Sequence, residues 1–246
     1  MAERVIGAVR AALGAEPRID LAHHPVSLSI SEDVLTMEGE LADVAAKKLA
    51  LERAASVVGV RHIVDRLRIS PARAMADTEI CDHLCDALLE EPAFRDHALT
   101  ACAGQPPPRA AEGGEGRRVL EISVDAGVVT LAGAVPSLAH KRLAGVLAWW
   151  VPGTRDVVNG LEVVPPEEDS DDEILEAVRT ALEKDPLVDA DQTRVTARDG
   201  AVTLDGVVPS PEQREMAEAD AWYVFGVDRV LNRILLRPAE HPPARR

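Results

Sequence analysis

The sequence predicts an α+β protein made of three tandem small α-β-β-α-β units, each a three-stranded mixed sheet with two helices on one face. Two observations predict this class. The segments 57–71, 151–165 and 224–238 superimpose without a gap, and upstream of them Gly39, Gly133 and Gly206 keep the same register. In each copy the apolar residues also change from helical spacing to strand alternation and back. Such internal repetition indicates three small domains of about 70 residues each.

A helix is predicted at the start of each copy, because apolar residues recur on one side of it. A proline follows in every copy, at Pro17, Pro92 and Pro186. The residue before a proline avoids the helical region, so the helix is expected to end there.

Two runs of alternating residues come next, and they predict a β-hairpin. In the first copy they cover 26–30 and 34–41, and the matching stretches are 119–135 and 193–208. The repeated glycines at 39, 133 and 206 interrupt the second strand of each hairpin. A residue without a side chain permits a bulge or a close backbone approach there.

A second helix and a last strand complete each copy. Asp43, Ser137 and Ser210 are predicted N-caps of the helix. The helix is expected to end at a glycine in the left-handed conformation, and these glycines are Gly59, Gly153 and Gly226. On the last strand of each copy, one polar residue falls on the same side as the alternating apolar residues. These residues are Asp65, Asn159 and Asn232 in repeats 1, 2 and 3. We interpret these residues as partners of local backbone groups at a bend; the alternative is a ligand site.

The repeats define the expected domain boundaries. Repeat 1 covers 1–70, repeat 2 covers 77–165, repeat 3 covers 171–238, and 239–246 form a disordered tail. Repeat 2 carries extra residues at about 98–117, where prolines and glycines predict a surface loop. The loop is either without function or a tether for a partner.

Composition excludes several classes of function. The formal net charge is −15, and the acidic excess lies in repeats 2 and 3. Such a field repels phosphate backbones, so nucleic acid is not expected as a partner, and adsorption to an anionic membrane is disfavoured. No apolar run is long enough to span a membrane. The first residues read as an amphipathic helix with charges and not as a signal peptide, which predicts a cytoplasmic protein.

The repeated pattern resembles the BON domain, named for bacterial osmotically induced and nodulation proteins. The segment RDGAVTLDGVV (198–208) with VFGVDRVLNRILL carries the resemblance best, DAGVVTLAGAV (125–135) nearly as well, and SEDVLTMEGEL (31–41) least. The resemblance implies attachment to phospholipid surfaces or envelope partners, often in osmotic or envelope stress and usually in periplasmic proteins. The motif consists of packing and turn positions, and it implies no chemistry.

Candidate metal and catalytic residues find no support in the comparison of the copies. Cys81 stands where the other copies have Ile6 and Leu175, so we expect it in the core, and Cys85 stands where they have arginines, so we expect it exposed. No phosphate-binding glycine loop, nucleophile elbow or zinc-helix motif occurs. The sequence therefore predicts no enzyme, no metal site and no cofactor.

Aromatic residues are the sharper anomaly, since five of the six fall at one place in repeats 2 and 3. They are Trp149, Trp150, Trp222, Tyr223 and Phe225. Adjacent large residues at a helix end cannot both face one core. We expect these residues either to dock repeats 2 and 3 on each other or to form a recognition surface. Basic residues near the start of the same helix, Lys47 among them, are expected to be solvated.

These observations predict a non-enzymatic binding or scaffold protein of three BON-like domains, acting in envelope or osmotic stress through protein or phospholipid contacts. The alternative is a small-ligand or cation-sensing protein, because acidic loops could collect ions.

Overall fold

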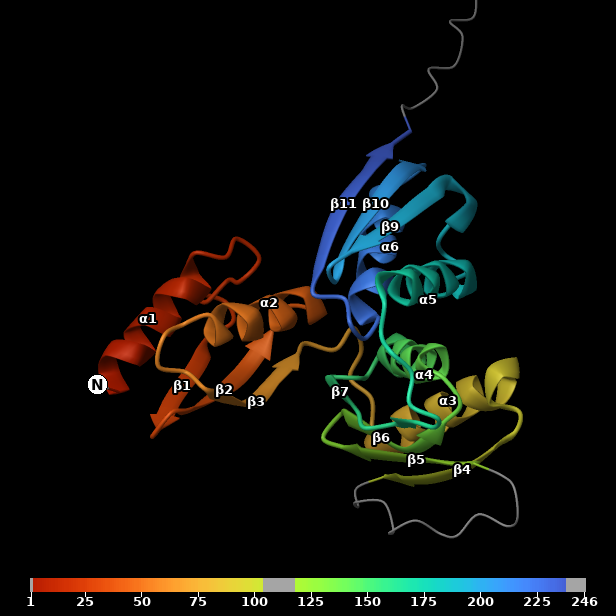
Figure 1. Cartoon of the computed structure of the whole chain (residues 1–246), viewed down its shortest axis with the longest axis horizontal. Helices are drawn as coiled ribbons and strands as arrows, with labels where there is room; N and C mark the ends of the chain where they lie inside the picture. Colours follow the sequence, from red (N-terminus) through yellow and green to blue (C-terminus); the bar gives the residue numbers. More distant parts are fainter. Residues whose placement is uncertain (1, 104–117, 238–246) are drawn as a thin grey trace, which may run out of the picture. The chain divides into compact units, whose positions relative to one another are not determined.

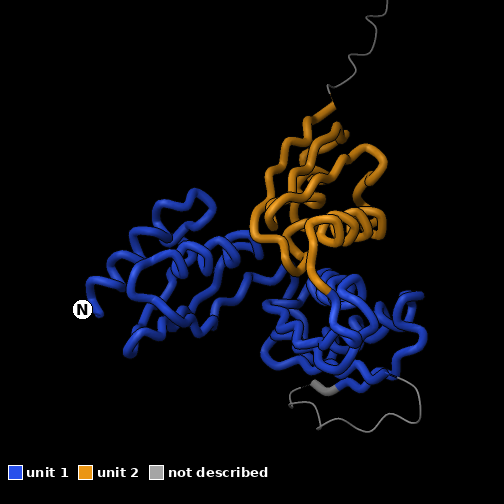
Figure 2. The backbone as a smooth tube through the Cα atoms, in the orientation of Figure 1, with its two compact units in different colours: residues 1–167 blue, residues 168–246 orange. Residues whose placement is uncertain are grey.

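The computed structural model describes residues 2–103 and 118–237, which form two compact units, 1–167 and 168–246 (Figures 1 and 2). Repeats 1 and 2 share the first unit, and repeat 3 lies in the second. The remainder of the predicted insertion and the predicted tail lie outside the described residues.

Repeats 1 and 3 have the predicted α-β-β-α-β order. In both, the middle strand pairs antiparallel with the first strand and parallel with the last, which gives a three-stranded mixed sheet. The elements of repeat 1 are α1 (Ala2–Gly14), β1 (Val26–Ser31), β2 (Val34–Leu41), α2 (Val44–Ala55) and β3 (His62–Ile69). Those of repeat 3 are α5 (Asp171–Lys184), β9 (Thr193–Arg198), β10 (Ala201–Val208), α6 (Pro211–Tyr223) and β11 (Arg229–Leu236).

Repeat 2 departs from the predicted three strands. Its elements are α3 (Asp77–Glu90), β4 (His97–Ala103), β5 (Arg118–Asp125), β6 (Val128–Val135), α4 (Leu138–Trp150), β7 (Asp156–Asn159) and β8 (Glu162–Val163). The prediction of a loop from 98 is wrong up to residue 103, because β4 pairs parallel with the edge of β5. The last predicted strand is also divided into β7 and β8, since the Gly160 N–H turns to donate to the Leu131 carbonyl at 2.8 Å. The sheet of repeat 2 therefore has five strands.

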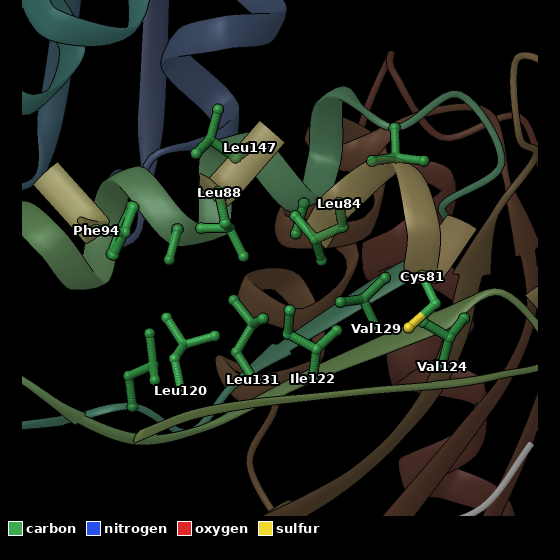
Figure 3. Packing of buried hydrophobic residues seen from close by; sticks show 14 of the residues in the cluster. Cys81, Leu84, Leu88, Phe94, Leu120, Ile122, Val124, Val129, Leu131 and Leu147 are labelled. Carbon is green, nitrogen blue, oxygen red and sulfur yellow. The ribbon is translucent and has the colours of Figure 1, made fainter. Parts of the chain in front are cut away.

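The core of repeat 2 lies between its helices and its sheet (Figure 3). Leu84 and Leu88 of α3 and Leu147 of α4 pack against Ile122 of β5 and Leu131 of β6. Repeat 1 builds the same kind of core from α1, α2 and the inward residues of β2 and β3. One face of each sheet is thus used for packing its helices, as expected for two-layer α+β units.

The cysteines of α3 follow the packing of this core. Cys81 is buried in it, as predicted. Cys85 is half-buried against the same core, so the prediction that it is exposed is wrong. Burial, together with the adjacent Cys81, raises the pKa of the Cys85 thiol to about 12. A thiol of that pKa is a poor nucleophile at neutral pH.

The polar residues on the last strands bond to the backbone, as the first interpretation requires. Asn159 donates to the Lys141 carbonyl at 2.7 Å and accepts from the Leu161 N–H at 3.4 Å. Asn232 makes the same two bonds in repeat 3, donating to the Arg214 carbonyl and accepting from the Ile234 N–H. Each asparagine therefore ties the last strand to the second helix.

The repeated glycines sit where the backbone comes close. A Cβ at Gly133 or Gly206 would lie 2.1 Å from a backbone oxygen, that of Val119 or Gln192. Gly59 and Gly226 have φ of 103° and 91°, and each lies in the turn after its helix and not at the helix end. Gly153 is not in the left-handed region, so that prediction is wrong. A Cβ there would instead lie 2.6 Å from Met75 Cβ.

We predict that Gly206→Ala destabilises repeat 3 by about 2–3 kcal/mol, because the new methyl group has to displace a backbone carbonyl. Gly7→Ala in α1 is the matched control, because nothing lies within 4 Å of its added Cβ. That change should stabilise repeat 1 by about 0.5–1 kcal/mol, since alanine favours helix. Denaturant unfolding followed by circular dichroism measures both effects, and equal stability of the two variants would contradict the prediction.

Candidate functional site

The five aromatic residues differ in accessibility. Trp149 and Trp150 end α4 and are half-buried, and Trp150 packs against the core of repeat 2. In repeat 3, Trp222 is only 3% exposed, Tyr223 is half-buried, and Phe225 is 48% exposed in the turn after α6. At the position of Phe225 repeat 1 has Val58, which is 95% exposed. The same turn therefore presents an apolar side chain in repeats 1 and 3.

A buried charge cluster joins repeats 1 and 2, and sequence reasoning missed it. The Lys47 side chain of α2 was expected to be solvated, but the residue is only 6% exposed. Its ammonium group lies 2.5 Å from Asp156 Oδ1 of repeat 2, 3.0 Å from Asp65 Oδ2, and donates to the Leu67 carbonyl at 2.9 Å. An ammonium group has three donors, and here each has an acceptor.

Arg68 completes the cluster from β3. Its Nη1 contacts Asp156 Oδ2 at 2.8 Å and also donates to the Leu67 carbonyl. Asp156 is 6% exposed, so its carboxylate has exchanged water for the two cations of repeat 1. A buried carboxylate is costly unless it is paired in this way. The cluster therefore specifies how the two repeats meet.

Comparison of the three repeats shows which residue difference accompanies the cluster. Asp65 occupies the position of Asn159 and Asn232, which donate an amide hydrogen to the backbone of the second helix. A carboxylate has no donor to offer there. In repeat 1 the Lys47 side chain, from the helix position of Lys141 and Arg214, contacts Asp65 instead. Asp65 among asparagines was the signal in the sequence that could have indicated a buried cation.

A second layer of contacts surrounds the cluster at the protein surface. Arg155 Nη2 lies 2.7 Å from Glu40 Oε2, and the Ser70 hydroxyl donates to the other oxygen of Glu40. These two partners, Ser70 first, lower the pKa of the Glu40 carboxyl. Two backbone bonds between the repeats, from the Ile69 N–H to the Arg155 carbonyl and from the Arg73 N–H to the Pro152 carbonyl, run alongside.

A cavity of about 440 Å³ opens beside this junction. The linker 71–76 forms one wall, and Glu40, Asp77, Gly127 and Arg155 contribute to the others. Its charged groups are already paired: Arg155 with Glu40, and the Asp77 carboxylate with the N–H groups of Ala126 and Gly127 at 2.9 and 2.8 Å. The Arg155–Glu40 pair joins the two repeats, whereas the Asp77 bonds lie within repeat 2.

Two histidines pack at one end of repeat 2. The rings of His97 and His140 lie 6.2 Å apart, and both meet the Phe94 ring edge-on. Burial lowers the pKa of both imidazoles, and Arg118 adds to the effect. For His97, Asp96 acts in the opposite direction, and for His140 Glu167 and Glu91 do so. Both histidines therefore favour the neutral form in the folded protein.

Within 2–103 and 118–237, no helix is long and apolar enough to cross a bilayer. Over the same ranges no group of three or more His, Cys, Asp or Glu side chains is placed to hold a metal ion.

The chain is a tandem array of two-layer α+β units, two of which meet through a junction of paired charges. The chain belongs to the BON domain family: the family model "BON domain" matches residues 3–71, 113–165 and 170–238, one segment in each repeat. The segment in repeat 2 starts within the insertion, so α3 lies outside it.

Comparison with solved structures gives matches of low similarity. One is the C-terminal domain of CdsD, the structural protein of the type III secretion system of Chlamydia trachomatis, with 13% identity, a TM-score of 0.25, and coverage of 95% of this chain and 98% of that chain. A second CdsD structure has 14% identity, a TM-score of 0.26, and coverage of 96% and 94%. TM-scores this low carry no argument about this chain. No curated protein matches the sequence.

We predict that Asp156→Ala destabilises the first unit by about 3 kcal/mol, because it leaves Lys47 buried without one of its two carboxylates. It should also speed tryptic cleavage at Arg73, which is exposed in the linker between the repeats. Arg155→Ala is the control, since its partly exposed pair with Glu40 contributes less than about 1 kcal/mol. Denaturant unfolding and timed proteolysis measure both variants. Unchanged cleavage in Asp156→Ala would show that the cluster does not hold the repeats together.

Acidification should destabilise repeat 2. The unfolded chain binds protons at His97 and His140 at a higher pH than the folded chain does, so stability falls as the pH drops below the ordinary histidine pKa of about 6.5. The fall is at most about 1.4 kcal/mol per pH unit for each histidine, and it ends below the folded pKa. Unfolding followed by the fluorescence of Trp149 and Trp150 measures it.

The double variant His97→Leu/His140→Gln should lose most of this pH dependence. His62→Gln, at an exposed position, should keep it. If the free energy of unfolding changed equally with pH in the wild type and both variants, titratable groups other than His97 and His140 would cause the effect.

Proposed function

We propose that the chain is a non-enzymatic scaffold of three BON domains that acts in envelope or osmotic stress through contacts with proteins or phospholipid surfaces. One observation carries the scaffold part of this proposal: a buried charge cluster joins the BON domains of repeats 1 and 2. A fixed spacing of interaction surfaces is what a scaffold needs, because the second contact then requires no further ordering.

Membership of the BON domain family supports a role in binding. The contact surface that we assign first is the apolar turn after the second helix. Phe225 in repeat 3 is 48% exposed and lies two residues after the half-buried Tyr223, and aromatic residues are enriched at protein and membrane interfaces.

Vesicle co-sedimentation tests the phospholipid contact. The full chain is mixed with neutral phosphatidylcholine vesicles and with vesicles that also contain phosphatidylglycerol. Phe225→Ala should reduce the bound fraction several-fold, because it removes the exposed aromatic ring. Val58→Ala, at the matching turn of repeat 1, is the control and should change binding little.

Binding to neither vesicle would overturn the phospholipid part of the proposal and leave the protein contacts. Binding that Phe225→Ala leaves unchanged would move the contact away from this turn. Trp222→Ala is not suitable as a test of this turn, because Trp222 is only 3% exposed and is not part of the accessible surface.

A further inference from the structure

The open face of the sheet in repeat 3 carries an ordered pattern of charge. Alternate residues of a strand point to opposite faces, and the inward set on β11 is Val230, Asn232 and Ile234. The outward set on β11 is Arg229, Leu231, Arg233 and Leu235. Register then places matching residues of β10 and β9 beside them.

The outward residues that pair across β9, β10 and β11 form rows, and the charge of these rows alternates. One row is Arg198–Ala201–Arg229, and the next is Thr196–Thr203–Leu231. The third is Arg194–Asp205–Arg233, and beyond it Val207 lies beside Leu235. Cationic rows thus alternate with neutral or apolar rows at the spacing of a sheet. We call these residues the arginine face.

The apolar members of the arginine face are accessible. Leu235 is 67% exposed, and Leu231 and Val207 are each 38% exposed. All four arginines of the face are also exposed. Val207 and Leu235 form one exposed apolar pair, and Leu231 lies on the other side of the row that holds Arg194 and Arg233. A single exposed apolar residue is ordinary, whereas apolar residues repeated between cationic rows on one sheet face suit an interaction surface.

The matching faces of the other repeats lack this pattern. Where repeat 3 has Arg194 and Arg198, repeat 1 has Ser27 and Ser31, and repeat 2 has Glu121 and Asp125. Where repeat 3 has Leu235, repeat 1 has Arg68 and repeat 2 has Glu162. A shared structural need of the fold would have kept one pattern in all three copies. The arginines also stand out in a chain whose net charge is −15.

We propose that the arginine face docks an acidic amphipathic helix of a partner protein. A helix is the natural cover for an open sheet face, and the opposite face of this sheet already packs α5 and α6. A leucine or isoleucine stripe on the partner would cover Leu231, Leu235 and Val207. Aspartates or glutamates beside that stripe would meet the arginines, which bind carboxylates in bidentate geometry. The inference rests on the scaffold function proposed above and names its partner.

An anionic bilayer fits this face less well. Asp205 lies in the middle of it, between Arg194 and Arg233, and would face the lipid phosphates. The strongly acidic remainder of the chain would be repelled by the same surface. A helix can avoid both conflicts, because its own side chains can leave room for Asp205 and its contact area is limited to one face.

The test measures binding of two synthetic helical peptides to the full chain by fluorescence anisotropy. Both peptides carry a leucine stripe; one is flanked by glutamates and the other by lysines. Two variants change the arginine face, Arg194→Glu/Arg233→Glu and Leu231→Ser/Leu235→Ser. The matched control Val64→Ser/Arg66→Glu changes the corresponding positions of repeat 1. All changed residues are exposed, and circular dichroism checks that each variant folds.

The proposal expects binding of the acidic peptide over the basic one. Each repeat 3 variant should weaken that binding by about tenfold, and the repeat 1 control by less than about twofold. Equal binding of both peptides, no binding of the acidic peptide, or an equal loss in the control overturns the proposal.

A bilayer or a second copy of this chain on the arginine face would give results that differ from those of a partner helix. If phosphatidylglycerol vesicles bind through the arginine face and the acidic peptide does not, the partner is a bilayer and the proposal is wrong. If light scattering shows self-association that the repeat 3 variants abolish, the occupant is a second copy of this chain and the proposal is again wrong. Neutral phosphatidylcholine vesicles carry no net charge for the arginines to recognise, so the effect of Phe225→Ala on binding to these vesicles tests the scaffold proposal separately from the peptide experiment.

Discussion

The arrangement of repeats 1 and 2 depends on a single buried cation. Lys47 has left water, and a desolvated ammonium group is tolerated only where its donors find acceptors. Two of these acceptors, Asp65 and the Leu67 carbonyl, come from repeat 1, and the third, Asp156, comes from repeat 2. A displaced repeat 2 would leave Asp156 without its two cations and Lys47 without its third acceptor. Apolar contacts between small domains tolerate sliding, whereas a buried charge cluster has few alternative geometries. The cluster therefore acts on specificity more than on net stability.

The three copies share an interior and differ at their surfaces. Interior positions have to fill the same space between two helices and a sheet, so substitutions there stay apolar and similar in size. Outward positions are under no such constraint. At one outward position on the last strand the copies have His62, Asp156 and Arg229, three different charge characters on one backbone. In repeat 2 this residue joins the inter-repeat cluster, and in repeat 3 it belongs to the arginine face. The residue at this position therefore has different surroundings in the three repeats, although the fold is the same.

Most of the fold could be predicted from the sequence, because periodicity and capping residues act locally. Ser137 and Ser210 accept hydrogen bonds from the N–H groups of His140 and Gln213, as N-caps should. Strand β4 was missed, since its seven residues carry no clear alternation and it forms only because the β5 edge accepts it. Lys47 was missed for a related reason: a lysine on a helix is buried only when another domain covers it. The exposure of each aromatic residue likewise depends on tertiary packing, which no local pattern records.

In a tandem array, stability is approximately the sum of what each copy contributes and what the contact between neighbouring copies contributes. Asp65, which stands where the other two copies have an asparagine, makes the contact between repeats 1 and 2 unlike one between identical copies. Deletion of repeat 1 would leave Asp156 without its cations, and an extra copy of repeat 2 would present Lys141 and Asn159 where its neighbour needs Lys47 and Asp65. The contact between repeats 1 and 2 is thus specific to these two copies. Their outward residues can differ in sequence while this contact keeps the two repeats in place.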